Sequence, residues 1–313
     1  MKKKSPKKSG VSLTIKLGES DTLKIKLADV LVPPGKKINL KKDFDPRFTA
    51  GYKNEKAARA KVKANVALLS KLQDKLYAQD RYSLLIIFQA MDAAGKDGVI
   101  KHVMSGVNPQ GCEVTSFKTP STEELDHDYL WRTVKALPRR GEIGIFNRSH
   151  YEEVLITRVH PEILQRQKLP PSALEGDIFQ KRYESINNFE NHLVENGTMV
   201  LKFFLNLSKK EQARRFLARV ENPDKNWKFS DADYAERQHW DHYQEAYETC
   251  ISNTSTPHAP WFVIPADHKW FTRLAVSEAI VRSLSLLPLE YPVVTPEHKK
   301  MITGIGKKLK KEV

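Results

Sequence analysis

Residues 83–98 carry the sequence SLLIIFQAMDAAGKDG, and this stretch determines the expected fold. It begins with a continuous apolar run, which is typical of a strand buried on both faces in a parallel sheet. Small residues follow, and apolar residues at helical spacing resume from Val99 to Met104. A strand, a small-residue loop, a Gly-Lys pair and a helix together form the layout of a phosphate-binding P-loop. Backbone N–H groups at such a helix start face an anion, and the helix dipole favours it.

Within this loop, Lys96 is expected to reach a terminal phosphate as a mobile point charge. Asp92 is unusual, because an acid would repel phosphate unless a cation lies between them, so we expect it to face a metal. The pattern is imperfect: Ala90 replaces the first glycine, and Asp97 replaces the metal-binding Ser or Thr. A plain surface turn with a solvated lysine is the alternative. The expected phosphate-binding residues beside Lys96 are Ala93, Ala94, Gly95, Asp97, Gly98 and Lys101.

Length and composition limit the class of protein. The chain has 313 residues, 40% of them hydrophobic and 29% charged, which suffices for one large α/β domain and excludes wholesale disorder. Apolar runs stay shorter than the 18 or so residues of a membrane span, and we expect no membrane partner. The N-terminus has no signal-peptide pattern, and Cys112 and Cys250 lack metal-ligand spacing. These features predict a cytoplasmic protein.

The net charge of +14 lies largely at the ends of the chain. Residues 1–8 carry five lysines, and residues 297–313 carry six lysines and two glutamates. The total net charge therefore does not indicate a nucleic-acid role, and we expect no nucleic-acid partner. A long polyanionic substrate is compatible with this charge. We expect an N-terminal arm over 1–52, a kinase domain over 53–290 and a basic tail over 291–313. Within the arm, residues 11–17 and 23–27 show alternating apolar and polar residues. This pattern predicts either edge strands or an extended arm that lies on a neighbour.

Strand and helix patterns alternate along the rest of the chain. Further strands are expected at 112–117, 142–146, 198–205 and 260–265. Helices are expected over 55–78, from Ser121 toward Pro138, over 179–195 and over 270–287. Ser121 and Glu124 form the sequence pattern of a capping box. This alternation predicts a three-layer α/β/α sandwich of the P-loop kinase type, with a central parallel five-stranded sheet.

Polar residues follow three of these strands. Ligands of such sheets bind at the carboxyl ends of the strands, so these residues should converge on one cleft. In P-loop enzymes, the third of these strands usually ends in an acid that orients the metal; here the residue is Asn147, a weaker magnesium ligand, and Glu152 is near enough to supply the charge. The alternative for Glu152 is a first-turn acid that interacts with the helix dipole. The converging set is Asp92, Lys96, Lys118, Thr119, Asn147, Arg148, His150 and Glu152.

Residues 208–240 interrupt the alternation with a basic helical segment. In nucleotide-phosphorylating P-loop kinases, this position carries a lid that brings cations onto the transferring phosphoryl group. Arg215 and Arg219 are four residues apart and should share a helix face. Lys225 and Lys228 follow them. A solvated basic helix is the alternative.

Four ordered segments resemble type-2 polyphosphate kinases, and the resemblance covers about residues 53–287. They are Gln89–Gly98, Tyr129–Arg132, Phe146–Glu152 and Asn226–Phe229. The Asn147 variant resembles the class III branch, whose members phosphorylate nucleoside mono- and diphosphates. The resemblance implies that the loop aspartate, loop lysine and following arginine are Asp92, Lys96 and Arg148, and that the lid cations are Arg215, Arg219 and Lys228. Glu152, from the strand-end argument, joins the expected catalytic residues, and Arg132 is expected to bind substrate.

The resemblance implies a reversible transfer of the terminal phosphoryl of inorganic polyphosphate to AMP and ADP. GMP and GDP remain open as further acceptors. It implies Mg²⁺, with Mn²⁺ as a substitute, held near Asp92, Asn147 and Glu152. ATP is then a product, and a homo-oligomer, dimer or tetramer, is expected. The second metal ligand is open, because Asn147 departs from the acid of other branches.

Two other classes share some of these features. An ATP-dependent nucleoside monophosphate kinase of the thymidylate or adenylate kinase type also has a P-loop and a lid, but it does not need a long basic channel. A nucleic-acid-binding P-loop protein would explain the positive ends, although the sequence has no recognition-helix or zinc pattern.

Overall fold

The computed structural model describes residues 25–313. Its centre is one five-stranded sheet with the order β2-β3-β1-β4-β5, and every neighbouring pair is parallel. This arrangement confirms the predicted parallel α/β sheet. The strands are β1 (Ser83–Gln89), β2 (Cys112–Ser116), β3 (Ile143–Asn147), β4 (Thr198–Asn206) and β5 (Trp261–Pro265).

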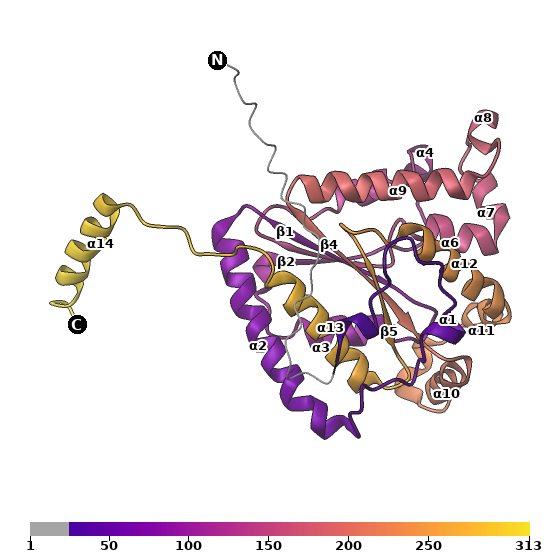
Figure 1. Cartoon of the computed structure of the whole chain (residues 1–313), viewed down its shortest axis with the longest axis horizontal. Helices are drawn as coiled ribbons and strands as arrows, with labels where there is room; N and C mark the ends of the chain where they lie inside the picture. The colour runs from indigo at the N-terminus through magenta and orange to yellow at the C-terminus, as the bar shows by residue number, and fades with distance from the viewer. Residues whose placement is uncertain (1–24) are drawn as a thin grey trace, which may run out of the picture.

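Helices cover both faces of the sheet (Figure 1). Strand β1 is buried along its whole length, and alternate residues enter two separate cores: Leu84 and Ile86 one, Leu85 and Ile87 the other. The first core contains α2 (Glu55–Gln79), α3 (Lys96–Val103) and α13 (Lys269–Leu284). The second contains α6 (Glu152–Val159), α9 (Ile178–Glu195) and α12 (Trp240–Thr254). The predicted α/β/α layers are therefore present.

The segment before α2 packs onto this sandwich. The N–H of Val32 donates to the carbonyl of Trp261, and the N–H of Val263 donates to the carbonyl of Val30. Residues 30–32 therefore run antiparallel along the outer edge of β5. The segment contains η1 (Leu27–Asp29) and α1 (Leu40–Asp43). Of the strand expected at 23–27, the described residues 25–27 form no strand, and Leu27 begins η1. The strand expected at 11–17 lies outside the described residues. The domain boundaries expected from the sequence remain a prediction.

One predicted helix is split in two. Instead of one helix from Ser121 toward Pro138, the structure has α4 (Thr122–Asp126) and α5 (Trp131–Lys135). The Asp128 side chain accepts a hydrogen bond from the backbone N–H of Leu130, a local turn that competes with helix. The capping box of Ser121 and Glu124 is formed as predicted.

The lid segment comprises α10 (Lys209–Val220), η3 (Pro223–Lys228) and α11 (Asp231–Gln238), and follows β4 directly. The chain ends in α14 (Pro296–Leu309), which stands away from the sandwich in Figure 1 and has no buried residue. Within residues 25–313, no helix is both long and apolar enough to cross a membrane. The remaining short elements are η2 (Pro109–Gly111), α7 (Pro161–Gln165) and α8 (Pro171–Leu174).

Candidate active site

The P-loop connects the end of β1 to the start of α3. Ala93 and Gly95 both have left-handed backbone conformations, with φ of 61° and 101°. Glycine adopts this conformation freely, but alanine does so at a cost of roughly 1–2 kcal/mol. Gly95 is the N-cap of α3, and Lys96 is its first residue. The turn thus places the helix N-terminus at the carboxyl end of the sheet, where an anion is favoured.

Lys96 folds back over this turn. Its Nζ donates to the carbonyl oxygen of Ala90 at 3.2 Å. Burial lowers the pKa of Lys96, and the positive charge of Arg148 lowers it further, although Asp92 and Glu152 act in the opposite direction. A bound anion would relieve this unfavourable environment, because it would stabilise the charged ammonium.

The first part of α10 braces the P-loop from outside. The Gln212 carboxamide donates to the carbonyl oxygen of Asp92 at 3.0 Å. Arg215 Nη1 donates to the carbonyl oxygens of Ala93 and Ala94 at 3.0 and 2.8 Å. Three successive loop carbonyls are therefore held on the side of α10, which stabilises the left-handed conformation of Ala93.

Arg215 lies differently from the expected free lid cation. Its side chain is only 7% exposed, and Nη2 donates to the carbonyl oxygens of Ala266 and Asp267 after β5. Nε donates to Glu211 at 3.0 Å, so all five N–H groups have partners within the protein. Arg215 and Arg219 do not act as an equivalent pair, because Arg215 links the P-loop to the end of β5.

We expect Arg215→Ala to lower the free energy of unfolding by about 3 kcal/mol, because hydrogen bonds to charged groups are worth roughly 1.5–3 kcal/mol and the loop carbonyls lose their partners. Urea unfolding of the full chain measures this value. Arg214→Ala is the matched control: its side chain is 65% exposed and, among residues 25–313, pairs only with Glu211, so a change below about 0.5 kcal/mol is expected. Equal stability of the two variants would contradict the conclusion that Arg215 stabilises the P-loop.

The end of β3 meets the P-loop through two polar contacts. Asn147 Nδ2 donates to Asp97 Oδ1 at 2.7 Å, and Arg148 Nη2 pairs with Asp92 Oδ1 at 3.1 Å. Arg148 also has a left-handed backbone, with φ of 63°. Residues that are 50 or more positions apart in the chain thus converge, as the strand-end argument predicts. The Arg148 and Asp92 side chains remain partly open to solvent.

Glu152 lies behind these groups, at the first position of α6. Burial raises the pKa of its carboxyl, while Arg148 and Lys96 act in the opposite direction. In the carboxamide orientation that satisfies both of its ends, Gln89 donates to Glu152 Oε1 at 2.9 Å and accepts from Ser149. The negative charge of Glu152 raises the pKa of Arg148 and so favours its guanidinium form.

The structure does not bring His150 to the site. Its side chain is fully buried, and neither ring nitrogen has a hydrogen-bond partner among the described residues. Nε2 lies 3.8 Å from Glu190 Oε1, next to a buried network. In that network Lys202 donates to Glu190 at 2.6 Å, to the hydroxyl of Tyr151 at 2.9 Å and to the carbonyl of Thr254 at 2.7 Å.

Two cavities meet at the P-loop. The first, here called the strand-end cavity, has a volume of about 520 Å³. It lies over the ends of β1, β2 and β3 and contains nearly all the residues that the strand-end argument selected. Its lining is Asp92, Ala93, Gly95, Lys96, Asp97, Ser116, Phe117, Lys118, Thr119, Asn147, Arg148, Arg219, Lys228 and Asp233.

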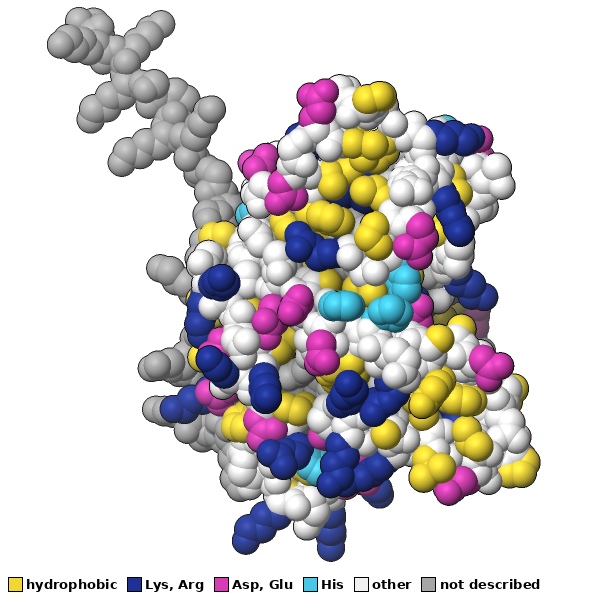
Figure 2. Space-filling view, turned by 90° about the vertical axis from the view of Figure 1, so that its right-hand side faces the viewer, with side chains coloured by type: hydrophobic (Ala, Val, Ile, Leu, Met, Phe, Trp, Pro, Cys, Tyr) yellow, Lys and Arg dark blue, Asp and Glu magenta, His cyan; other side chains and the backbone are white. Residues whose placement is uncertain are grey.

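The second, here called the cationic cavity, has a volume of about 500 Å³ and lies between the P-loop, the lid and α13. Figure 2 shows Lys and Arg side chains gathered on the lower part of the face that includes the lid. The cavity has two acidic residues, Asp97 and Glu211, in its lining. Its basic residues are Arg214, Arg215, Arg219, Lys225, Lys228, Lys269 and Arg273.

Arg219 and Lys228 line both cavities, so they lie where the two meet. Nη1 of Arg219 donates to the carbonyl oxygen of Lys228 at 3.0 Å and is 3.5 Å from Asp233 Oδ2, and these contacts connect α10, η3 and α11. A group that passes from one cavity to the other would cross these two cations and the start of α3.

Besides His150, two predicted binding residues lie outside both cavities. Arg132 is nearly buried: Nη1 donates to the carbonyl oxygen of Lys118 at 2.8 Å, and its guanidinium covers the ring of Phe117. It can therefore position the Lys118 loop. Lys101 is exposed on α3.

The charged lining residues that sequence reasoning missed include Lys269, Arg273 and Asp233. Lys269 follows β5, so the strand-end argument could have included it. Arg273 is one turn further along α13, and Asp233 comes from the lid, where the helix α11 turns it toward the sheet. For these two, the sequence carries no local signal.

Known proteins match this chain closely. The family model for polyphosphate kinase 2 matches residues 52–288. An ADP-polyphosphate phosphotransferase from Rhodopseudomonas palustris is 51% identical over 290 residues, which is 92% of this chain and 100% of the relative. An AMP/ADP-polyphosphate phosphotransferase from Meiothermus ruber is 44% identical over 272 residues, covering 87% and 97% of the two chains.

The fold matches as well. The crystal structure of polyphosphate kinase 2 from Arthrobacter aurescens superimposes with a TM-score of 0.79 at 39% identity, covering 90% of this chain and 97% of that one. The P-loop, the strand-end residues and the lid all lie inside the matched family region. The chain is therefore a member of the polyphosphate kinase 2 family.

Proposed function

We propose that this protein transfers the terminal phosphoryl group of inorganic polyphosphate to AMP and ADP. The observation that carries the proposal is the cationic cavity: seven basic side chains and two acids surround the P-loop where a donor chain would lie. A polyanionic donor suits such a lining better than a neutral one. The two relatives named for ADP and for AMP/ADP support the acceptors.

In this proposal, the donor lies in the cationic cavity and the acceptor phosphate in the strand-end cavity. An oxygen of the acceptor phosphate attacks the terminal phosphorus in line, a new P–O bond forms, and the bond to the bridging oxygen breaks. The shortened polyphosphate leaves with the electron pair. Because the attacking oxygen is already anionic, no strong general base is needed, and positioning with charge neutralisation supplies the rate.

The residues take separate roles. Lys96, Arg148, Arg219 and Lys228 neutralise charge on the transferring group, and the P-loop N–H groups hold the phosphates. Arg215 fixes the loop, and Glu152 places a negative charge near Arg148 that stabilises its guanidinium. Lys225 lies in the donor cavity, Lys118 in the acceptor cavity, and Arg132 supports Lys118.

Magnesium fits the strand-end cavity. Within the described chain, no three His, Cys, Asp or Glu side chains converge as a closed metal site. Mg²⁺ does not need such a site, because it is usually bound by one or two carboxylates together with substrate phosphates and waters. Asp92 and Asn147 both line this cavity and would hold the ion, whereas Glu152 is outside the lining. The ion would neutralise phosphate charge, and Mn²⁺ would substitute for Mg²⁺ in this role. The proposal also places the protein in the cytoplasm, as a homo-oligomer.

One assay tests the function. The full chain is incubated with Mg²⁺, AMP and polyphosphate but without ATP, and nucleotides are separated by chromatography. ADP followed by ATP is the expected result. Product formation from AMP only when ATP replaces polyphosphate would overturn the proposal and identify an ATP-dependent monophosphate kinase.

Asp92→Asn should lower turnover and raise the Mg²⁺ concentration for half-maximal activity about tenfold or more, because it keeps the shape but removes the ligand charge. Titration of Mg²⁺ at fixed polyphosphate and AMP measures both effects. Loss of the Arg148 ion pair alone would lower turnover equally at every Mg²⁺ concentration. An unchanged Mg²⁺ dependence would therefore exclude Asp92 as a ligand.

A further inference from the structure

The C-terminal helix α14 has two faces of opposite character. The Thr295 side chain caps it by accepting a hydrogen bond from the N–H of His298 at 3.3 Å, and Pro296 occupies the first turn. Apolar residues at helical spacing form one side, here called the apolar stripe: Met301, Ile302, Ile305 and Leu309. Six lysines lie on the opposite side or at its border: Lys299, Lys300, Lys307, Lys308, Lys310 and Lys311.

The rest of the described chain does not cover the apolar stripe. Each of its four residues is 48–53% exposed, and α14 has no buried residue. Residues 290–295, which connect α14 to the sandwich, are also exposed and form neither helix nor strand. Among residues 25–313, the hydrogen bonds of α14 stay within residues 295–312, and its lysines form no ion pair.

The length of α14 indicates that the apolar stripe has a partner. The helix has 14 residues, and Gly304 and Gly306 lie within it. A helix this short is marginal in water, glycine weakens it further, and its stability comes mainly from burial of an apolar face. Because the sandwich leaves the stripe open, the surface that buries it must lie outside this copy of the chain.

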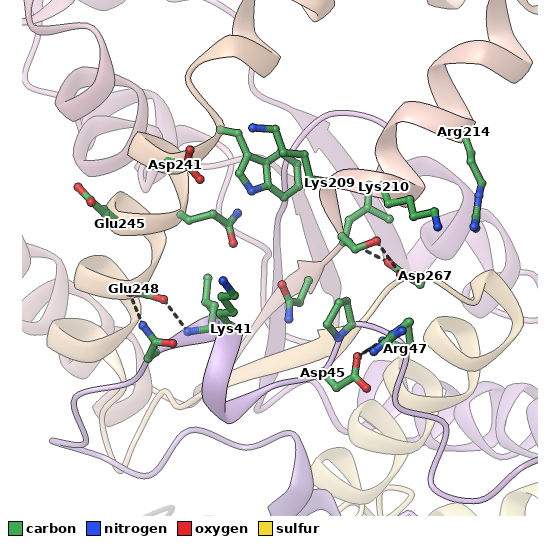
Figure 3. A pocket seen from close by; sticks show the side chains of 18 residues that line it. Lys41, Asp45, Arg47, Lys209, Lys210, Arg214, Asp241, Glu245, Glu248 and Asp267 are labelled. Carbon is green, nitrogen blue, oxygen red and sulfur yellow. Dashed lines mark hydrogen bonds and ion pairs between the residues drawn. The ribbon is translucent and has the colours of Figure 1, made fainter.

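Two cavities of the sandwich do not suit α14 of a second copy. One of about 920 Å³ lies between the segment before α2 and the start of α10, and its ten labelled residues in Figure 3 are five acids and five cations. It therefore offers the lysines no net attraction. The other, of about 410 Å³, lies between α2, α3 and α13. Arg59, Lys63 and Arg273 line it against one acid, Glu55, so it would repel them.

An anionic lipid surface suits both faces of α14. Negative headgroups attract the lysines, and the apolar stripe enters the boundary between headgroups and acyl chains. Polyphosphate or a nucleic acid would bind the lysines but leave the stripe in water. Two α14 helices paired along the stripe would bring two sets of lysines together without neutralising them.

We propose that α14 attaches the protein to anionic membrane surfaces as a helix that lies in the interface. Such a helix spans nothing, so the prediction of no membrane partner, which considered only spanning segments, does not extend to it. In Figure 1, α14 lies to the left of the sandwich and the lid helices α10 and α11 lie to the right. Attachment through α14 thus leaves the P-loop accessible. The inference does not depend on the proposed function.

The test measures sedimentation of the full chain with lipid vesicles. Vesicles of equal parts phosphatidylglycerol and phosphatidylcholine should bind the wild type at least about tenfold more tightly than vesicles of phosphatidylcholine alone. Ile305→Glu places a charge in the apolar stripe. Thr303→Glu is the matched control, because it adds the same charge on the lysine side of the same helix.

The two variants should differ in their binding to the anionic vesicles. Thr303→Glu should weaken it about fivefold, the effect of one charge near an anionic surface. Ile305→Glu should weaken it at least about tenfold more than Thr303→Glu does, because the stripe no longer inserts. Turnover of AMP and polyphosphate without vesicles should equal that of the wild type in both variants.

Several results would overturn the proposal. Equal binding of Ile305→Glu and Thr303→Glu would mean that the chain binds by charge alone, through α14 or through the five lysines of residues 1–8. Equal binding to both kinds of vesicle, or none, would contradict it as well. A lower mass of Ile305→Glu than of Thr303→Glu in sedimentation velocity without vesicles would show that the stripe joins copies of this chain. A wild type without polyphosphate-dependent turnover would instead refute the proposed function and leave the vesicle result unaffected.

Discussion

Lys96→Ala should lower kcat at least about a hundredfold and leave the free energy of unfolding unchanged or slightly higher. The loss corresponds to about 3 kcal/mol, as for removal of one group that stabilises charge in the transition state. Stability should not fall, because partial burial and the nearby charge of Arg148 lower the pKa of Lys96 in the free protein. Steady-state turnover with polyphosphate and AMP, together with urea unfolding, measures the two quantities.

The control separates this effect from a general loss of charge. Lys71→Ala removes an exposed lysine from α2 that lines neither cavity at the P-loop, and should keep wild-type turnover. Lys96→Arg keeps the positive charge but not its compact shape, so it should recover only part of the activity. Near-normal turnover of Lys96→Ala would refute the P-loop assignment.

Glu190→Ala should lower the free energy of unfolding by about 3–5 kcal/mol, because it leaves the fully buried Lys202 without its counter-charge. The Lys202 ammonium has three hydrogen-bond partners, and one of them is this carboxylate. Removal of Glu190 also leaves the Tyr151 hydroxyl without its acceptor. Urea unfolding at neutral pH measures the loss.

The matched control is the double variant Glu190→Gln with Lys202→Met, which removes both charges and keeps the side-chain volumes. It should recover most of the lost stability, since a buried ion pair can often be replaced by neutral groups at little cost. A double variant as unstable as Glu190→Ala would show that the network matters through hydrogen bonds alone.

The same pair predicts a pH dependence. Burial raises the pKa of Glu190, but Lys202 and His150 outweigh it and hold that pKa below its usual value. The unfolded chain therefore binds the proton more readily than the native one, so this contribution to stability is complete above the ordinary pKa of Glu. It is lost as the pH falls below that value toward the lowered native pKa. The double variant should lack this acid-dependent part.

Much of the site followed from local sequence. The apolar run before Asp92, and the Gly95-Lys96 pair after it, identify a strand, a loop and a helix start within 16 residues. The strand-end argument then grouped Asn147 and Arg148 with the loop, and the structure brings them into contact. Such local signals suffice because parallel strands necessarily place their carboxyl ends at one edge.

Other features depended on contacts between distant elements. His150 follows β3 like its neighbours, yet it turns into the core beside Glu190. Arg215 has the helical spacing of a lid cation, yet the packing of α10 on the P-loop uses every one of its N–H groups. The split between α4 and α5 depends on the Asp128 side chain, which competes with the helix for the backbone.

By itself, the sequence determined the fold class, the P-loop and the set of strand-end residues, because hydrophobic periodicity and glycine positions are local properties of the chain. Only the tertiary structure decided which basic residues face a cavity and which are held by backbone carbonyls. A cation's role depends on the partners that surround it: Arg215 donates to P-loop carbonyls more than 100 residues away in the chain, whereas Arg214 pairs with Glu211 on its own helix. Two adjacent arginines of one helix thus differ in role, because Arg214 points to solvent and Arg215 donates to the carbonyl oxygens of the P-loop.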